Sequence, residues 1–350
     1  MCVASKKAGW IPLKAGSVVD VVAPGFRPTD AEAESGIRFL ESWGLKPRVP
    51  KDLFGKDVLS SNSDQARARQ LIKALESPSS DAVWCLRGGY GSIRLVPFLM
   101  KMKKPKRMKP ILGLSDITTL QQFVLKRWGW SSLQTPLLDR LGRIVSPELA
   151  MSESGKMRPL PIAEEVTELR SILFGEKTTI RHEGLKPLGK TRGGGASKTL
   201  VKGVMAGGNL LTYASANGTA IHPDTSGQIL YFEDVGERGY RVDRWLVQMA
   251  QAGILSRKTK AIVFGEFIEG NEPQGGSLVG DVLARFAKEW ADVNKVPVYS
   301  GVLSGHGQHQ RVVPIGTQAT LDPKTGVLEI ETGVGLGGGR GIRPTMGPIK

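Results

Sequence analysis

The chain has 350 residues, with 48 Lys and Arg against 33 Asp and Glu, which gives a formal net charge of +15. Single hydrophobic cores stop growing near about 250 to 300 residues, so this length predicts two domains. With 40% hydrophobic and 23% charged residues, the composition is typical of a globular protein and excludes a disordered or collagen-like chain.

The sequence lacks the signals of a membrane protein. No apolar run approaches the roughly 18 residues of a spanning helix, and the start of the chain lacks the apolar core of a signal peptide. We therefore expect a cytoplasmic protein with no membrane partner. Cys2 leaves an alternative open, because it fits the first residue of an exported, lipid-anchored protein whose signal has been removed. Cys85 lies in an apolar run, which predicts a buried, inert thiol.

Strand and helix patterns alternate in the first part of the chain. They predict strands at 17–23, 81–86 and 110–114 and helices at 30–45, 64–76, from Ser92 and at 116–128. Strands separated by such helices pair in parallel, which predicts a doubly wound parallel sheet. Ligands of such sheets bind beyond the carboxyl ends of the strands, so the loops of interest are 23–26, 87–91 and 113–116.

A connecting region with weaker periodicity follows, and then a second α/β series. The second series has predicted strands at 228–232, 260–264 and 296–300, helices at 240–252 and 277–291, and a hairpin at 318–322 and 326–330. We expect an N-terminal α/β domain at 1–145, which carries the nucleophile, and a connecting region at 146–200. A smaller C-terminal α/β domain with antiparallel strands follows at 201–332, and then a glycine-rich tail at 333–350. The tail contains G-x-G-x-x-G at 333–338, but no helix follows it, so it is no dinucleotide site.

The segment 101–109 carries six cations and no acid. Such a run fits phosphate backbones, or equally a solvated loop. No stacking aromatics accompany it, so we expect no nucleic-acid partner.

Histidine is scarce, at four positions, which shortens the search for a general base. His306 stands between two glycines just after a predicted strand, where its ring would face a cleft. His309 is a near rival.

Ser115 lies where a predicted strand meets a helix, as nucleophilic serines of α/β enzymes do. Only half of the G-x-S-x-G motif is present, and a serine here also fits a helix cap. The glycines of the 87–92 loop allow amide groups to face a ligand oxygen, and Glu233 ends another strand, where a carboxylate can orient a histidine.

Six motifs resemble, in the same order, those of the LD-carboxypeptidase family of serine peptidases. They are APG from Ala23, RGGYGS from Arg87, GLSDIT from Gly113, GVMAGGNL from Gly203, FEDVGE from Phe232 and GHG from Gly305. The resemblance covers about residues 16–330. It implies a flavodoxin-like or Rossmann-like domain, a C-terminal α/β domain, an active site between them and a homodimer. Leu114 replaces the frequent Tyr or Phe of the family, which leaves the catalytic positions intact.

The resemblance also implies the chemistry. It makes Ser115 the nucleophile, His306 the base and Glu233 the residue that orients the histidine. Oxyanion donors would be the backbone N–H groups of Asp116 and of Gly88 or Gly89, without any metal or organic cofactor. The implied substrate is a murein tetrapeptide that loses its terminal D-Ala during cell-wall recycling, with pocket residues Arg87, Tyr90 and Asn209.

Two alternatives remain open. One is a microcin C immunity peptidase, which uses the same triad on an aminoacyl-nucleotide and needs an aromatic platform for the base. Within 140–200 the only aromatic residue is Phe174, which weakens this alternative. The other is a basic binding protein for anionic polymers, whose binding would be strongly salt-dependent and would survive the loss of Ser115.

Overall fold

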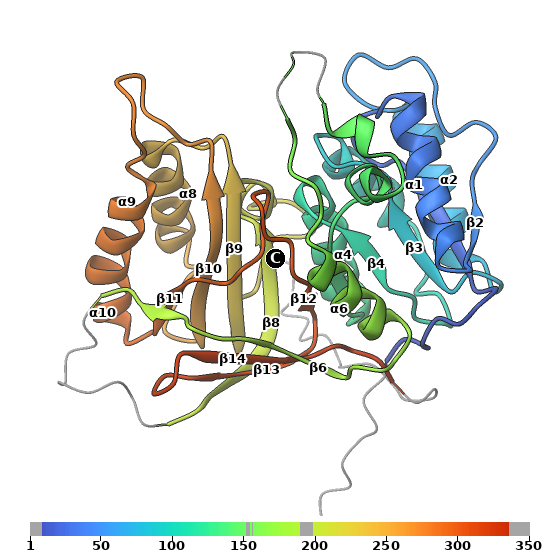
Figure 1. The fold of residues 1–350 in the computed structure, drawn as a ribbon. Helices are drawn as coiled ribbons and strands as arrows, with labels where there is room; N and C mark the ends of the chain where they lie inside the picture. The colour runs from blue at the N-terminus through green and yellow to red at the C-terminus, as the bar shows by residue number, and fades with distance from the viewer. Residues whose placement is uncertain (1–8, 152–154, 156, 190–198, 336–350) are drawn as a thin grey trace, which may run out of the picture.

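A computed structural model describes residues 9–151, 155, 157–189 and 199–335. Two β-sheets lie side by side, each with helices packed on it, and segments from both halves of the chain pass between them (Figure 1). The predictions for Cys2, for the 190–198 part of the connecting region and for most of the glycine-rich tail lie outside the described residues.

The first sheet has six strands in the order β12-β5-β4-β3-β1-β2. The strands from β5 to β2 are parallel, and β12 pairs antiparallel with β5. These strands are β1 (Val18–Val22), β2 (Lys46–Arg48), β3 (Ala82–Cys85), β4 (Ile111–Gly113), β5 (Ser132–Gln134) and β12 (Val313–Ile315). The helices of this part are α1 (Asp30–Ser42), α2 (Asp64–Glu76), α3 (Val96–Leu99), α4 (Thr118–Trp128) and α5 (Leu138–Leu141).

The second sheet has eight strands in the order β6-β14-β13-β8-β9-β10-β11-β7. The four strands from β8 to β11 are parallel, and the flanking strands pair antiparallel. These strands are β6 (Thr179–His182), β7 (Lys186–Pro187), β8 (Val201–Asn209), β9 (Gln228–Val235), β10 (Ala261–Ile268), β11 (Val298–Ser300), β13 (Gln318–Asp322) and β14 (Val327–Glu331). The helices of the later chain are α6 (Ala163–Leu173), α7 (Leu210–Ala214), α8 (Gly239–Gln251), α9 (Val279–Phe286) and α10 (Asp292–Asn294).

The predicted mixture of parallel and antiparallel α/β units is confirmed, and several elements match closely. Helix α2 has the predicted ends, and the Ser63 hydroxyl caps it by accepting from the N–H of Ala66. A capping box between Thr29 and Glu32 starts α1. The hairpin of β13 and β14 is also where the sequence predicts it.

Two features differ from the expectation. Strand β12 comes from the late part of the chain but completes the first sheet, which a pattern of local periodicity cannot reveal. The predicted connecting region contains α6 and two strands of the second sheet. Helix α6 has a narrow apolar face, because only Leu169, Ile172 and Leu173 are buried, and this face is too short to stand out in the sequence.

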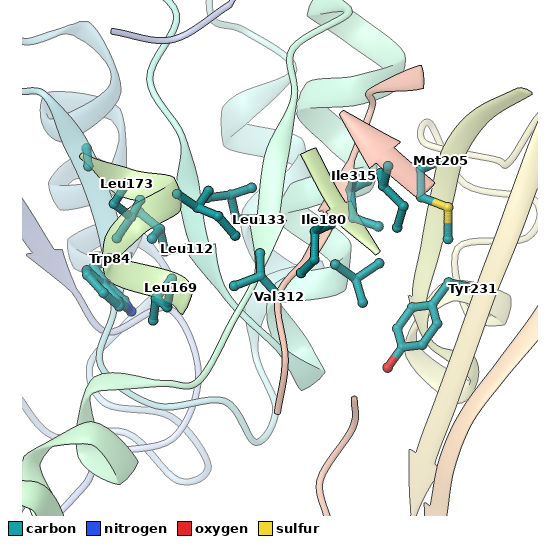
Figure 2. Close-up of a cluster of buried hydrophobic side chains, with 14 of the residues drawn as sticks. Trp84, Leu112, Leu133, Leu169, Leu173, Ile180, Met205, Tyr231, Val312 and Ile315 are labelled. Carbon is teal, nitrogen blue, oxygen red and sulfur yellow. The ribbon is translucent and has the colours of Figure 1, made fainter. Parts of the chain in front are cut away.

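One hydrophobic core joins the two sheets. Figure 2 shows Trp84, Leu112 and Leu133 of the first sheet in the same cluster as the α6 leucines and as Met205 and Tyr231 of the second sheet. Because this cluster is continuous, the two sheets are held by buried apolar surface as well as by strand β12.

The predictions for Cys85 and for the basic segment can be compared with the structure directly. Cys85 is completely buried, and burial raises the pKa of its thiol, as expected for an inert cysteine. The segment 101–109 is a loop, but it is not fully solvated. Lys109 is buried and donates to the carbonyl oxygens of Ala74 and Ser77 at the end of α2. Burial lowers the pKa of Lys109 to about 8.

Candidate active site

Ser115 stands at the carboxyl end of β4 with a backbone φ of +68°, a region that residues other than glycine rarely adopt. It opens the short 3₁₀ turn Ser115–Ile117, which leads into α4. Leu114 occupies the cap position of the turn, and no side chain caps either the turn or α4. The helix-cap interpretation of Ser115 is therefore wrong. The strained backbone instead resembles that of nucleophilic serines between a strand and a helix.

The glycine-rich loop after β3 lies directly against Ser115. A Cβ atom placed on Gly88 would stand 2.9 Å from the Cβ and 3.3 Å from the Oγ of Ser115. On its other side, the carbonyl of Gly88 accepts a 2.8 Å hydrogen bond from the N–H of Phe26. Gly89 has a φ of +94°, so the loop turns in a way that other residues resist. The three loops of interest thus meet at Ser115.

The side chain of Asp116 fixes this meeting point. Its Oδ2 accepts a 2.8 Å hydrogen bond from the backbone N–H of Ser92, at the end of the glycine-rich loop. The carboxylate is buried, and burial raises its pKa to about 6. The backbone N–H of Asp116 is a predicted oxyanion donor, and the side chain of the same residue bonds to the neighbouring glycine-rich loop.

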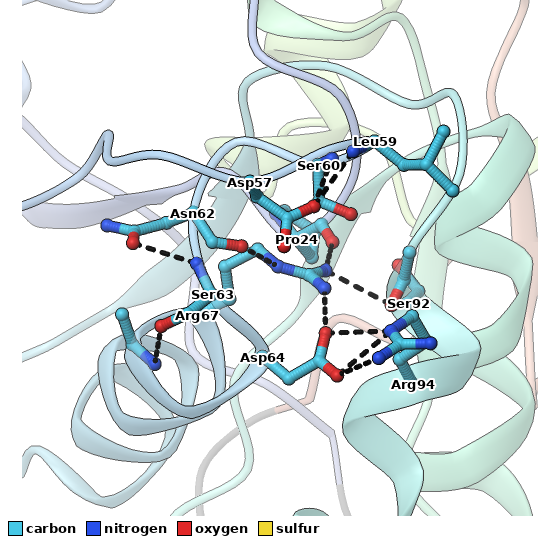
Figure 3. Close-up of polar contacts among 12 residues, drawn as sticks. Pro24, Asp57, Leu59, Ser60, Asn62, Ser63, Asp64, Arg67, Ser92 and Arg94 are labelled. Carbon is cyan, nitrogen blue, oxygen red and sulfur yellow. Dashed lines mark hydrogen bonds and ion pairs between the residues drawn. The ribbon is translucent and has the colours of Figure 1, made fainter.

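Arg67 of α2 binds the backbone of the loops next to Ser115, and the sequence analysis did not identify it. Figure 3 shows its guanidinium between two segments, where it donates to the carbonyl oxygens of Pro24, Asn62 and Gly91. Its ion pair with Asp64 is shared with Arg94. Arg67 is almost completely buried, and a charged residue on the inner face of a helix was the signal that could have identified it.

His306 forms a hydrogen bond with Glu233, as predicted. The Nδ1 of His306 lies 2.6 Å from Oε2 of Glu233, a fully buried carboxylate on β9. A proton on Nδ1 leaves Nε2 free to accept another. Burial by itself would lower the pKa of His306, but the charge and hydrogen bond of Glu233 outweigh it and raise the pKa above its ordinary value.

The turn of Ser115 and the strand of Glu233 are linked through β8. The backbone N–H of Asn209 donates to the hydroxyl of Thr118, 3.0 Å away, three residues after the serine. On its other side, Asn209 pairs with Glu233 across the parallel β8–β9 ladder. The serine turn and the Glu233–His306 pair therefore belong to one continuous group of contacts at the carboxyl ends of the strands.

The predicted pocket residues have defined partners. Arg87 is about one-third exposed and forms ion pairs with Glu32 at 3.2 Å and with Asp139 at 3.8 Å. Tyr90 is exposed. The side chain of Asn209 is buried, caps α7 and donates to Asp234. Contact of these residues with a substrate stays a prediction.

The rival His309 has a different partner. Its Nδ1 lies 2.7 Å from Glu165 of α6, and its side chain is 37% exposed. His182 is buried against the carbonyl of Val312, and burial lowers its pKa to about 4. The remaining histidine, His222, accepts from the N–H of Gly218.

Within the described ranges, three or more His, Cys, Asp or Glu side chains nowhere come together as a metal site would require. No helix in the same ranges combines the length and the apolar character needed to cross a membrane.

Comparison with known proteins identifies the family of this chain. Residues 19–135 match the N-terminal domain of LD-carboxypeptidases, and residues 202–321 match the C-terminal domain. A putative carboxypeptidase of Rickettsia conorii is 33% identical over 290 residues, 82% of each chain. The murein tetrapeptide carboxypeptidase of Pseudomonas aeruginosa is 31% identical over 319 residues, 89% of this chain and 95% of that one.

Solved structures agree with these matches. The muramoyltetrapeptide carboxypeptidase of Oxalobacter formigenes superposes with a TM-score of 0.70 at 27% identity, over 89% of this chain and 99% of that one. The microcin C7 self-immunity protein MccF superposes with a TM-score of 0.74 over 92% of this chain and 98% of its own, but at 19% identity it shares the fold alone. The resemblance inferred from the six motifs is thus confirmed, and the chain belongs to the LD-carboxypeptidase family.

Proposed function

We propose that the protein is a serine-type LD-carboxypeptidase that removes the terminal D-Ala from murein tetrapeptides in cell-wall recycling. The observation that carries this proposal is the pairing of His306 with the buried Glu233 in a fold whose Ser115 has a positive φ beside a glycine-rich loop. The names of the relatives from Pseudomonas aeruginosa and Oxalobacter formigenes support the choice of substrate.

The proposed first step is acyl transfer to Ser115. Nε2 of His306 takes the hydroxyl proton while Oγ attacks the carbonyl carbon that precedes D-Ala, which gives a tetrahedral oxyanion. The backbone N–H groups of Asp116 and of Gly88 or Gly89 stabilise this oxyanion. His306 then gives its proton to the amine of D-Ala, which leaves.

The second step releases the shortened peptide. His306 takes a proton from water, the resulting hydroxide attacks the acyl carbon, and the proton returns to the Oγ of Ser115. Glu233 keeps the proton of the imidazole on Nδ1 throughout and stabilises the imidazolium. No metal or organic cofactor takes part in this sequence of steps.

Arg87, Tyr90 and Asn209 contact the peptide, with Arg87 facing a carboxylate. The protein is a cytoplasmic homodimer with an N-terminal α/β domain at 1–145, a connecting region at 146–200 and a C-terminal α/β domain at 201–332. Its partner is the murein peptide, with no nucleic acid and no membrane.

Two other functions would use the same chain differently. An aminoacyl-nucleotide substrate is the first, because MccF, which shares this fold, has been solved in complex with aspartyl sulfamoyl adenosine. However, Phe174 packs on Trp43 and under Arg170, so it offers no free platform for a base. Binding of anionic polymers would rely on the basic segment 101–109, where Arg107 is paired with Asp81 and Lys109 is buried. Two of the six cations in the segment are therefore not available to a polymer, which weakens this second function.

The test is release of D-Ala from a purified murein tetrapeptide by the wild type and by the Ser115→Ala variant. Loss of a triad serine costs on the order of 10⁶ in turnover, so we expect release by the wild type alone. Equal release by both proteins would exclude Ser115 as the nucleophile. If neither releases D-Ala, an aminoacyl-nucleotide is offered to the same pair, and cleavage by the wild type alone would replace the murein substrate with that one.

A further inference from the structure

The segment that carries His306 has no regular secondary structure. It runs between β11 and β12, so side chains from other elements must hold it in place. Helix α6 supplies the closest of these contacts. Glu165 uses one carboxylate oxygen for Nδ1 of His309 and the other for the backbone N–H of Gln310, each at 2.7 Å. The carboxylate is only 10% exposed.

A second hydrogen bond connects Gln310 to the residue that precedes His306. The side-chain amide of Gln310 donates to the carbonyl of Gly305 at 2.9 Å, and Gln310 is buried. A chain of hydrogen bonds thus runs from Glu165 through Gln310 to Gly305. Gly305 has a φ of +149° and passes so close to Glu233 that a Cβ there would lie 3.2 Å from Oε2. The backbone at this point has little freedom to shift without moving the ring of His306.

Two arginines complete the support. Arg140 donates to the carbonyl oxygens of His306 and Gln308 at 3.4 and 3.1 Å. Arg311 forms two hydrogen bonds with Glu168, one turn after Glu165 on α6. Two carboxylates of α6 therefore bind the segment at residues 309–311, and Arg140 binds it at His306 and Gln308.

We propose that Glu165 is a positioning residue for the proposed hydrolysis, because it holds the 305–310 segment so that His306 stays on Glu233 with its other nitrogen free for the serine. The inference rests on the proposed function but assigns a role to a helix that the sequence places in a connecting region. Glu165 touches no reacting atom. Its effect passes through Gln310 and Gly305.

The test compares three variants of the full-length protein. Glu165→Ala removes both contacts, and a misplacement of about 1 Å in such a site costs about 10²-fold, so we expect kcat to fall by about that factor with little change in KM. Glu165→Gln keeps an oxygen for the N–H of Gln310 and an amide for His309, so it restores most of kcat. Glu164→Ala, on the exposed neighbour in the same helix turn, keeps wild-type kcat.

A second readout needs no substrate. NMR titration of the histidine ring signals measures the pKa of His306, which burial and Arg140 lower and Glu233 and Asp234 raise, with a net increase. If Glu165 positions the ring on Glu233, Glu165→Ala lowers this pKa. Glu165→Gln, which removes the same charge but keeps the hydrogen bonds, leaves it near the wild-type value. Equal shifts in both variants would mean that the charge alone acts, and would overturn the proposal.

The two readouts separate this inference from the proposed function. If the wild type releases no D-Ala, the proposed substrate is wrong, and the titration alone decides the role of Glu165. Unchanged kcat and unchanged His306 pKa in a folded Glu165→Ala protein would overturn the inference. If that variant does not fold, Gln310→Ala, which breaks the same chain one step later, is measured in its place with the same expectations.

Discussion

The carboxylate of Asp116 accepts a 2.8 Å hydrogen bond from the backbone N–H of Ser92, which joins the turn of the candidate nucleophile to the end of the glycine-rich loop. The bond connects residues that follow two neighbouring parallel strands, β3 and β4. A buried acid is a costly way to make this connection, since the charge loses its hydration. The cost makes the contribution of Asp116 to stability measurable.

Asp116 should lower stability at neutral pH. Its pKa in the folded protein is about 6, against 3.8 for an ordinary Asp, because burial disfavours the charge. The folded state therefore holds this proton more tightly than the unfolded state, and its contribution to the free energy of unfolding falls as the pH rises from about 4 to about 6, by about 3 kcal/mol. Between pH 4 and pH 7.5 the free energy of unfolding of the wild type should therefore fall by about 3 kcal/mol more than that of Asp116→Asn. Urea unfolding of both proteins at the two pH values measures this.

A surface acid serves as the control for that experiment. Asp281 is exposed at the start of α9, so Asp281→Asn should keep the pH dependence of the wild type. If Asp116→Asn also keeps the wild-type dependence, the carboxyl of Asp116 does not hold an elevated pKa.

Gly88 should tolerate no side chain. A Cβ there would lie 2.9 Å from the Cβ of Ser115, closer than real Cβ atoms approach other atoms, and the φ of Gly88 is not in the positive region. Gly88→Ala therefore tests the close approach rather than backbone strain. We expect kcat for D-Ala release to fall by about 10²-fold, because the serine and the oxyanion donors move apart.

The matched control is Gly280→Ala in α9, where an added Cβ meets nothing within 4 Å. This change should leave kcat unchanged and raise the free energy of unfolding by about 0.5 to 1 kcal/mol, as alanine in a helix does. Wild-type activity of Gly88→Ala would show that the loop does not press on the serine in solution.

The pH profile should report the His306–Glu233 pair. A general base must be neutral, and Glu233 raises the pKa of His306 above 6.5 despite burial. Activity should therefore fall as the pH drops through this raised pKa, so the acid limb of kcat/KM in the wild type lies above pH 6.5. The measurement is D-Ala release across the pH range.

Replacement of the carboxylate tests the same pair from the other side. Glu233→Gln should lower kcat by about 10⁴-fold, because the imidazole is no longer held in the right tautomer, and should move the acid limb to lower pH. Glu329→Gln, on an exposed position of β14, is the control and should change neither quantity. An acid limb that does not move in Glu233→Gln would argue that another group limits the rate at low pH.

Arg67 should be a major source of stability in the loops beside the site. Its guanidinium is buried and satisfies three carbonyl oxygens as well as Asp64. Arg67→Met should lower the free energy of unfolding by about 3 kcal/mol, since Asp64 loses a buried partner and the carbonyl groups lose their donor. Arg69→Met on the same helix removes a 63% exposed arginine and should cost less than about 1 kcal/mol. Similar losses in both variants would contradict the supporting role of Arg67.

The sequence alone was enough to predict the elements that depend on local pattern. Helix α2, the hairpin of β13 and β14 and the strand–turn–helix around Ser115 all follow from periodicity and from residue types that determine turns. The ordered motifs, through their resemblance to the LD-carboxypeptidase family, also identified Ser115, Glu233 and His306 as candidates.

Only the tertiary structure decided which residues meet. His306 and His309 are near neighbours in the chain, yet the first pairs with Glu233, 73 residues away, and the second with Glu165, 144 residues away. Two other long-range contacts could not be predicted either. Strand β12 lies late in the chain but pairs with β5, and Lys109 is buried against the end of α2. Local periodicity reports which face of an element is buried, whereas these contacts depend on how distant elements pack against one another.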